Sequence, residues 1–124
     1  MIGYVTVGSS DLERSRAFFD TVLAELGAKR VFNNERQSAW RAGKQMLMAC
    51  IPYDKNDPSV GNGTMVALQA ESKEHVARVW QTALDAGAAD EGAPGFRTDT
   101  FYGAYFRDPD GNKFAVFLFT RRDA

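Results

Sequence analysis

Few residues of this sequence have side chains that commonly perform chemistry, and they do not cluster along the chain. There is one histidine, His75, and one cysteine, Cys50. His75 falls in the first turn of a predicted helix, where we expect it to be solvated. Cys50 has no basic neighbour in sequence, so we interpret it as a small buried hydrophobe. Acid–base chemistry by the hydroxyls of Tyr4 or Tyr105 would need an activating cation, and the sequence identifies none.

The stretch around residue 110 is a turn whose chemistry can be read residue by residue. Asp108 can accept a hydrogen bond from its own backbone two residues on, Pro109 presets φ, and Gly111 can adopt a positive φ. Aromatic and β-branched residues flank it on both sides. The pattern predicts a β-hairpin with strands over 101–107 and 112–120.

Composition and charge limit the classes of protein to consider. The 124 residues are 44% hydrophobic and 25% charged, which is typical of one folded domain. Fifteen basic and sixteen acidic residues leave a net charge of -1, so neither nucleic acid nor a membrane surface is an expected partner. No apolar run is long enough to span a bilayer, and no signal peptide is recognisable. One cysteine excludes an intrachain disulfide, and we expect a cytoplasmic protein.

The predicted elements follow one order in each half of the chain. In the first half, Ser10 is the expected N-cap of a helix over 11–26, completed as a capping box by Glu13. In the second half, Ser72 is the expected N-cap of a helix that ends at Gly87. Residues 91–99 contain glycine and proline and are predicted to be a loop. Strands are predicted over 2–8, 28–33, 37–42, 45–52, 64–70, 88–90, 101–107 and 112–120.

The two halves align as a weak internal repeat of about sixty residues. Placing Tyr4 on Met65 also places Val5 on Val66 and Val7 on Leu68. We therefore predict an α+β fold made of two βαβββ modules. A single domain over 1–124 would contain module one at about 1–53, a linker at 54–62 and module two at about 63–121.

Three features of the sequence point to a family: the duplicated unit, residues 10–20 (SDLERSRAFFD) and residues 107–114 (RDPDGNKF). In these features the sequence resembles the vicinal oxygen chelate superfamily. That superfamily includes glyoxalases, bleomycin-resistance proteins and extradiol dioxygenases. The resemblance covers nearly the whole chain. It implies a curved mixed sheet around a cleft, a homodimer, and in the enzymes a divalent metal held by histidine and glutamate side chains.

The resemblance also implies where the metal ligands would stand. A histidine is common in the first strand of each module, and the matching residues here are Tyr4 and Met65. A glutamate is expected four residues after Gly111, where the chain has Ala115, and the first-module counterpart is Leu47. None of these side chains is a typical ligand of a catalytic divalent ion. We predict no metal and no cofactor.

Strand alternation predicts which side chains line the cleft. Pairing of Phe106 with Phe114 would place Tyr105 opposite Ala115 in the cleft, and Cys50 is predicted to point to the opposite, helix-packed face. Trp40 and Arg97 are predicted at the rim. The remaining predicted ligand-binding residues are Tyr4, Thr6, Leu47, Met65, Ala67, Gln69, Phe101, Tyr105, Ala115 and Phe117. An alternative is that these side chains fill the cleft as core.

Three functions are compatible with the sequence. The first is a metal-independent protein that binds a small, largely apolar or aromatic molecule in a cleft of a homodimer. The second is a lyase, isomerase or dioxygenase of the same superfamily that depends on an unrecognised metal site or on tyrosine. The third is a dimeric structural or interaction domain whose cleft is filled.

Overall fold

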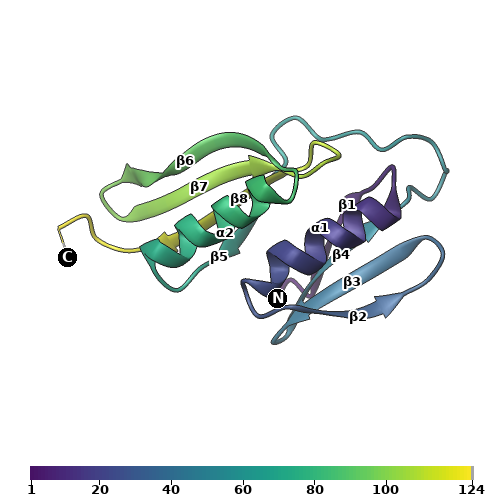
Figure 1. Cartoon of the computed structure of the whole chain (residues 1–124), viewed down its shortest axis with the longest axis horizontal. Helices are drawn as coiled ribbons and strands as arrows, with labels where there is room; N and C mark the ends of the chain where they lie inside the picture. Colours follow the sequence, from purple (N-terminus) through teal and green to yellow (C-terminus); the bar gives the residue numbers. More distant parts are fainter. Residues whose placement is uncertain (124) are drawn as a thin grey trace.

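Residues 1–123 are described in the computed structural model, in which a βαβββ unit occurs twice (Figure 1). The α+β fold with two modules is confirmed. The first module contains β1 (Tyr4–Gly8), α1 (Leu12–Ala24), β2 (Lys29–Asn33), β3 (Gln37–Ala42) and β4 (Gln45–Cys50). The second contains β5 (Val66–Gln69), α2 (Lys73–Asp85), β6 (Ala89–Thr98), β7 (Phe101–Arg107) and β8 (Lys113–Phe119).

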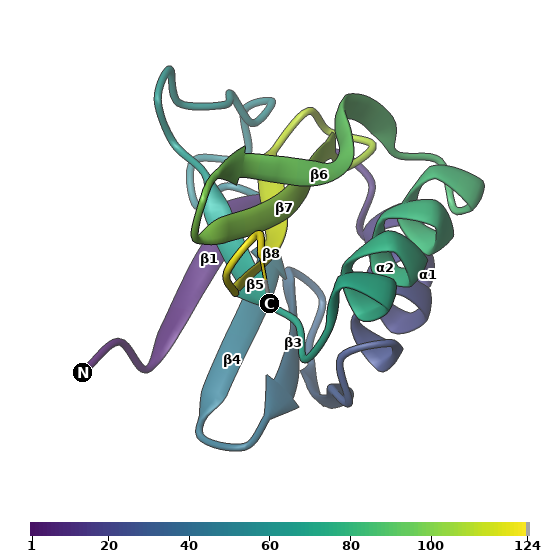
Figure 2. The same cartoon turned by 90° about the vertical axis from the view of Figure 1, so that its left-hand side faces the viewer.

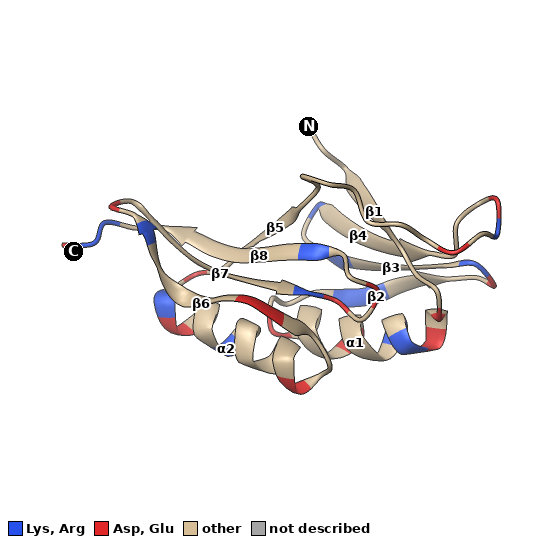
Figure 3. Ribbon diagram, turned by 90° about the horizontal axis from the view of Figure 1, so that it is seen from above, with Lys and Arg blue, Asp and Glu red and all other residues tan. Residues whose placement is uncertain are grey.

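Each module forms its own four-stranded mixed sheet. The strand orders are β1-β4-β3-β2 and β5-β8-β7-β6, so the first strand of each module pairs in parallel with the last. Both helices lie on the same side of the molecule and both sheets on the other (Figure 2, Figure 3). The other face of each sheet is covered by no helix of residues 1–123. We call this uncovered side the open face.

An aromatic core between helices and sheets joins the two modules. Phe19 of α1 contacts Trp40 of β3, with ring centroids 5.3 Å apart, and Phe114 of β8, at 5.7 Å. Phe18 contacts Phe106 of β7. All five rings are almost completely buried. Aromatic pairs of this geometry contribute about 0.5–1.5 kcal/mol beyond their buried area. Because rings of both modules are in contact, the two modules share one core.

The helix starts were predicted by capping chemistry, with one correction. Ser72 is the N-cap of α2, where its hydroxyl accepts a hydrogen bond from His75 N. At α1 the N-cap is Asp11 and not Ser10, because the Asp11 carboxylate accepts from Arg14 N at 3.1 Å. Ser10 instead donates to Asp110, one hundred residues away. Within residues 1–123 neither helix has the length and apolar character needed to cross a membrane.

The predicted loop over 91–99 is a strand. β6 runs from Ala89 to Thr98 and pairs with β7, with three shifts of register. One shift lies beside Gly92, whose φ of +159° brings the backbone close to the Tyr105 ring. Glycine and proline suggested a loop, but here they accommodate bulges in an irregular edge strand.

The prediction that His75 is solvated was wrong. Its side chain is 9% exposed and lies where α2 meets the end of α1. Nδ1 accepts a hydrogen bond from Glu71 N at 3.1 Å, and Nε2 lies 2.6 Å from the Glu25 carbonyl oxygen. The accepting Nδ1 makes Nε2 the protonated nitrogen of a neutral ring. His75 therefore joins the helices of the two modules and lies away from the open face.

The turn between β7 and β8 is stabilised by Asp108. Its carboxylate accepts hydrogen bonds from the backbone N–H groups of Asp110 and Asn112, and Gly111 has a φ of +91°. Burial raises the pKa of the Asp108 carboxyl, and the hydrogen bonds from Asn112 oppose that rise. The predicted hairpin and its turn chemistry are therefore confirmed.

The same turn binds the first module through two side chains. Asn112 Nδ2 donates to the carbonyl oxygen of Gly8, at the end of β1, at 2.9 Å. Asp110 Oδ1 accepts from the backbone N–H of Ser10 and from Arg14 Nη2, both at 3.0 Å. The Asp110 side chain is only 4% exposed. A carboxylate in this position also interacts favourably with the N-terminal dipole of α1.

Replacing Asp110 with alanine should destabilise the protein by about 2–3 kcal/mol, because Ser10 and Arg14 of module one would lose a buried, charged acceptor. The measurement is urea unfolding followed by circular dichroism. Asp123→Ala is the matched control, since its ion pair with Arg121 is exposed and should contribute less than about 1 kcal/mol. Equal stability of D110A and D123A would contradict the proposed contribution of this contact.

Candidate functional site

The open face of module two contains the site residues that were predicted there. β7 pairs with β8 so that Tyr105 is opposite Ala115 and Phe106 is opposite Phe114, as expected. Phe106 and Phe114 belong to the buried core, and alternation therefore places Tyr105 and Ala115 on the open face. The other open-face residues of this module are Ala67, Gln69, Phe101, Gly103, Phe117 and Phe119, and Met65 immediately precedes β5 on the same side.

Three phenylalanines form an aromatic cluster on this face. The rings of Phe101 and Phe117 are stacked, with centroids 5.4 Å apart and an angle of 2° between their planes. Phe119 meets both rings edge-on, at 5.8 and 5.2 Å. Phe119 is 68% exposed, and the other two are partly buried. Gly103 makes room for the cluster, since a Cβ there would lie 2.9 Å from the Phe101 ring.

In module one, the predicted orientation of β4 was wrong by one residue. Leu47 pairs with Val5 and Trp40, and it lies in the core beneath α1. Met46 pairs with Tyr4 and Met48 pairs with Thr6 on the open face. Cys50, predicted to face the helix, is on this open face too. Tyr4 and Thr6 are exposed there as predicted, and Tyr4 is 57% exposed.

Trp40 also lies on the helix side and not at a cleft rim. It is 1% exposed, and its indole Nε1 donates to Asp20 Oδ1 of α1 at 2.8 Å. Arg30 of β2 donates to the same carboxylate, and that hydrogen bond holds the pKa of Asp20 below its usual value. Trp40 is therefore a core residue that anchors α1 to the first sheet. Sequence alternation could not reveal this, because the partner is on another element.

The positions of the family's metal ligands do not form a metal site. Parallel pairing of β5 with β8 puts Ala67 beside Ala115, and the equivalent pair in module one is Thr6 with Met48. Met48, rather than Leu47, is therefore the counterpart of Ala115. Residues 1–123 contain no group of three or more histidine, cysteine, aspartate or glutamate side chains that could hold a metal ion. The hydroxyl, thioether and methyl groups found at these positions do not fit a catalytic divalent ion.

Two cations lie over the ring of Tyr105. The Arg97 guanidinium carbon is 5.2 Å from the ring centroid, and Lys113 Nζ is 5.4 Å from it. Arg97 is held by the carbonyl oxygens of Ala93 and Gly95. Arg97 was predicted at the rim, but Lys113 was missed. The sequence did contain a signal for Lys113: it stands two residues before Ala115 on the same predicted strand, so both side chains lie on one face.

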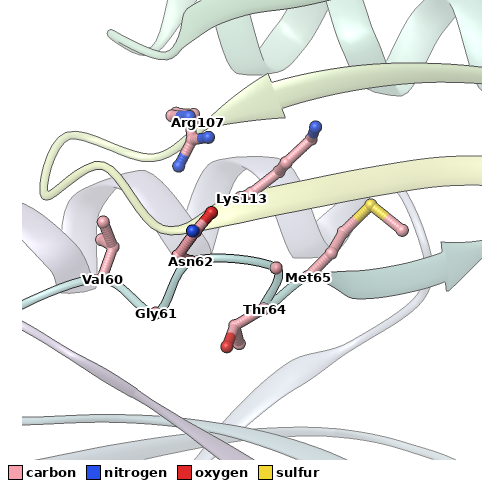
Figure 4. Close-up of a pocket in the computed structure, with 8 residues that line it drawn as sticks. Val60, Gly61, Asn62, Thr64, Met65, Arg107 and Lys113 are labelled. Atoms are coloured by element: carbon pink, nitrogen blue, oxygen red, sulfur yellow. The ribbon is translucent and has the colours of Figure 1, made fainter.

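A pocket of about 510 Å³ opens at the turn end of the β7–β8 hairpin (Figure 4). Arg107 and Lys113 line it from the hairpin, and the linker segment from Val60 to Met65 lines it from the other side. Of the predicted site residues, only Met65 is part of this lining. Arg107 was not predicted to be a site residue. It lines the pocket only together with the segment from Val60 to Met65, and no local sequence pattern predicts the path of that segment.

Comparisons with known proteins agree with the fold. The sequence profile of the Glyoxalase/Bleomycin resistance protein/Dioxygenase superfamily matches residues 1–116. A crystal structure of a glyoxalase/bleomycin resistance protein from Albidiferax ferrireducens T118 is 32% identical in sequence. It superposes with a TM-score of 0.91 over 97% of this chain and 99% of the other.

More distant solved structures are similar to this chain in fold. A glyoxalase/bleomycin resistance protein/dioxygenase family enzyme from Burkholderia phytofirmans PsJN is 19% identical, with a TM-score of 0.78 over 95% of this chain and 98% of that one. Lactoylglutathione lyase from Agrobacterium tumefaciens is 21% identical, with a TM-score of 0.72 over 95% and 92% of the two chains. No curated protein matched the sequence at a significant level.

The residues at the ligand positions lead to a prediction about metal content. Protein purified without chelators should contain well below one equivalent of any divalent metal per chain by elemental analysis. Treatment with EDTA should leave the thermal midpoint unchanged, because the residues at the expected ligand positions do not suit a divalent ion. A stoichiometric metal that withstands dialysis would refute the reading of Tyr4, Met65 and Ala115 as non-ligands.

Proposed function

The chain belongs to the Glyoxalase/Bleomycin resistance protein/Dioxygenase superfamily, and from this premise we propose that it binds a small, largely apolar or aromatic molecule without a metal. The aromatic cluster of Phe101, Phe117 and Phe119 carries the proposal. These rings lie on the open face, where a core role does not explain the high exposure of Phe119. A flat hydrophobic ligand would extend the existing stack.

The proposed ligand site includes a second copy of the chain. Four large apolar side chains on the open side are strongly exposed: Tyr4, Phe32, Met65 and Phe119. Both modules contribute to this surface, whereas the helices on the opposite side carry many of the charges (Figure 3). Exposed apolar surface of this kind is typical of an interface. We propose a homodimer in which the open face of the partner closes the cleft over the ligand.

An enzymatic role in this superfamily has less support from the residues of this chain. Metal-dependent chemistry has no suitable ligand set at the expected positions, as shown above. Arg97 and Lys113 lie over the Tyr105 ring, but within residues 1–123 no hydrogen bond joins the Tyr105 hydroxyl to a carboxylate or a histidine that could act as its acid–base partner. Binding requires only the apolar surface and is therefore the preferred function.

Ligand binding can be tested with the uncharged fluorescent probe N-phenyl-1-naphthylamine. We expect saturable binding that becomes about tenfold weaker, or about 1.4 kcal/mol, in Phe117→Ala, because the variant removes one ring of the stack. Tyr53→Ala is the control, since Tyr53 is an exposed aromatic residue that follows β4 and lies outside both sheets. Equal loss in both variants, or no saturable binding by the wild type, would overturn the proposed function.

The dimer can be tested by sedimentation velocity at micromolar concentration. The wild type should sediment as a dimer and Tyr4→Asp as a monomer, because a charge would enter an apolar interface. Tyr53→Asp should remain dimeric, since Tyr53 lies outside both sheets. A monomeric wild type, or a dimer that Tyr4→Asp leaves intact, would contradict an interface on the open face.

A further inference from the structure

The pocket at the end of the β7–β8 hairpin has an excess of positive charge. Arg107 and Lys113 line the pocket, and Arg97 and Lys113 lie over the ring of Tyr105. One carboxylate balances them, since Glu91 forms an ion pair with Arg107. Within residues 1–123 the Lys113 ammonium group has no carboxylate partner, and its cation–π contact is with the Tyr105 ring. On a chain with a net charge of -1, this concentration of basic groups is local.

Arg107 is held in a fixed position beside Lys113. Its Nε donates to Glu91, and Nη1 donates to the carbonyl oxygen of Gly111 at 2.8 Å. Arg107 and Lys113 are cross-strand partners at the base of the hairpin turn. In the described part of the chain only Arg107 of these two cations has a carboxylate partner, so an anion beside Lys113 would be stabilising.

The opposite wall of the pocket is formed by the linker. Thr64 N donates to the Gly61 carbonyl oxygen, and Gly63 has a φ of +92°, which defines a tight turn here. Val60 lies close to Gly111 of the hairpin turn, since a Cβ at Gly111 would be 3.6 Å from Val60 Cγ1. The side chains of Val60 and Met65 are exposed apolar groups on this wall. The pocket therefore has a basic side and an apolar side.

We propose that this pocket binds the carboxylate of a small aromatic acid, with Lys113 as the main charged contact. The ring of the acid would lie against Val60 and Met65, whose thioether packs well on aromatic rings. Arg107 would contribute a second positive charge to the carboxylate. Phe117 lies four residues further along β8 than Lys113, so this acid site is separate from the aromatic cluster. The inference therefore goes beyond the proposed function and assigns a second, negatively charged ligand.

Nuclear magnetic resonance of the ¹⁵N-labelled full chain can test this with benzoate, benzamide and inorganic phosphate. Benzoate should shift the amide signals of Gly61, Gly63 and Thr64 saturably. Benzamide has the same shape without the charge and should bind at least about tenfold more weakly. Phosphate should also bind more weakly than benzoate, because it lacks the ring that contacts the apolar wall.

The matched variants are Lys113→Gln and Lys44→Gln. Lys113→Gln should weaken benzoate binding at least about tenfold, whereas Lys44→Gln changes an exposed lysine in the turn between β3 and β4 and should have no effect. The amide spectrum of each variant also shows whether it remains folded. A folded Lys113→Gln protein that binds benzoate like the wild type would overturn the assignment of Lys113.

Three further results would contradict the inference. They are equal affinity for benzoate and benzamide, phosphate binding as tight as that of benzoate, and no saturable shift with benzoate. If N-phenyl-1-naphthylamine still binds in a manner that depends on Phe117, the proposed function stands and only the acid site fails. If neither probe binds, both fail together.

Discussion

The contact between the hairpin turn and the start of α1 is the constraint on which the rest of this structure depends. Asp108 shapes the turn from inside, so the side chains of Asp110 and Asn112 point towards module one. They bind Ser10 and Gly8, at the junction of β1 and α1. One turn thus sets the register of β7 against β8 and, together with the aromatic core, fixes the position of module two on module one. Because the Asp110 carboxylate is buried, this position is specified by charge as well as by packing.

The hairpin register explains why the sequence predicted the open face correctly in one module and incorrectly in the other. β8 is apolar on both faces, but the turn chemistry pairs Tyr105 with Ala115 independently of hydrophobic alternation. β4 (Gln45–Cys50) is also apolar on both faces and follows a two-residue turn with weaker signals. Alternation then cannot distinguish the two orientations, and a shift of one residue exchanges Leu47 for Met48.

The other errors came from contacts between residues far apart in the chain. The N-cap of α1 was predicted one residue early because the hydroxyl of Ser10 is used by Asp110. His75 and Trp40 are buried through partners on α1 that no local pattern reveals. Element order and the hairpin followed from the sequence, since each depends on neighbouring residues or on the repeat. The resemblance to the superfamily, rather than any local pattern, identified Ala115 as a position where a carboxylate is expected.

The two open faces differ although the modules repeat the same fold. The position of Lys113 in β8 corresponds to Met46 in β4, because Met48 corresponds to Ala115. Module one therefore presents methionines where module two presents a cation beside Tyr105. Neither module has a typical metal ligand at the compared positions, but Lys113 of module two is a charged group that lines a pocket. The duplicated fold supplies two faces of the same architecture, and the side chains on them make the two faces chemically different.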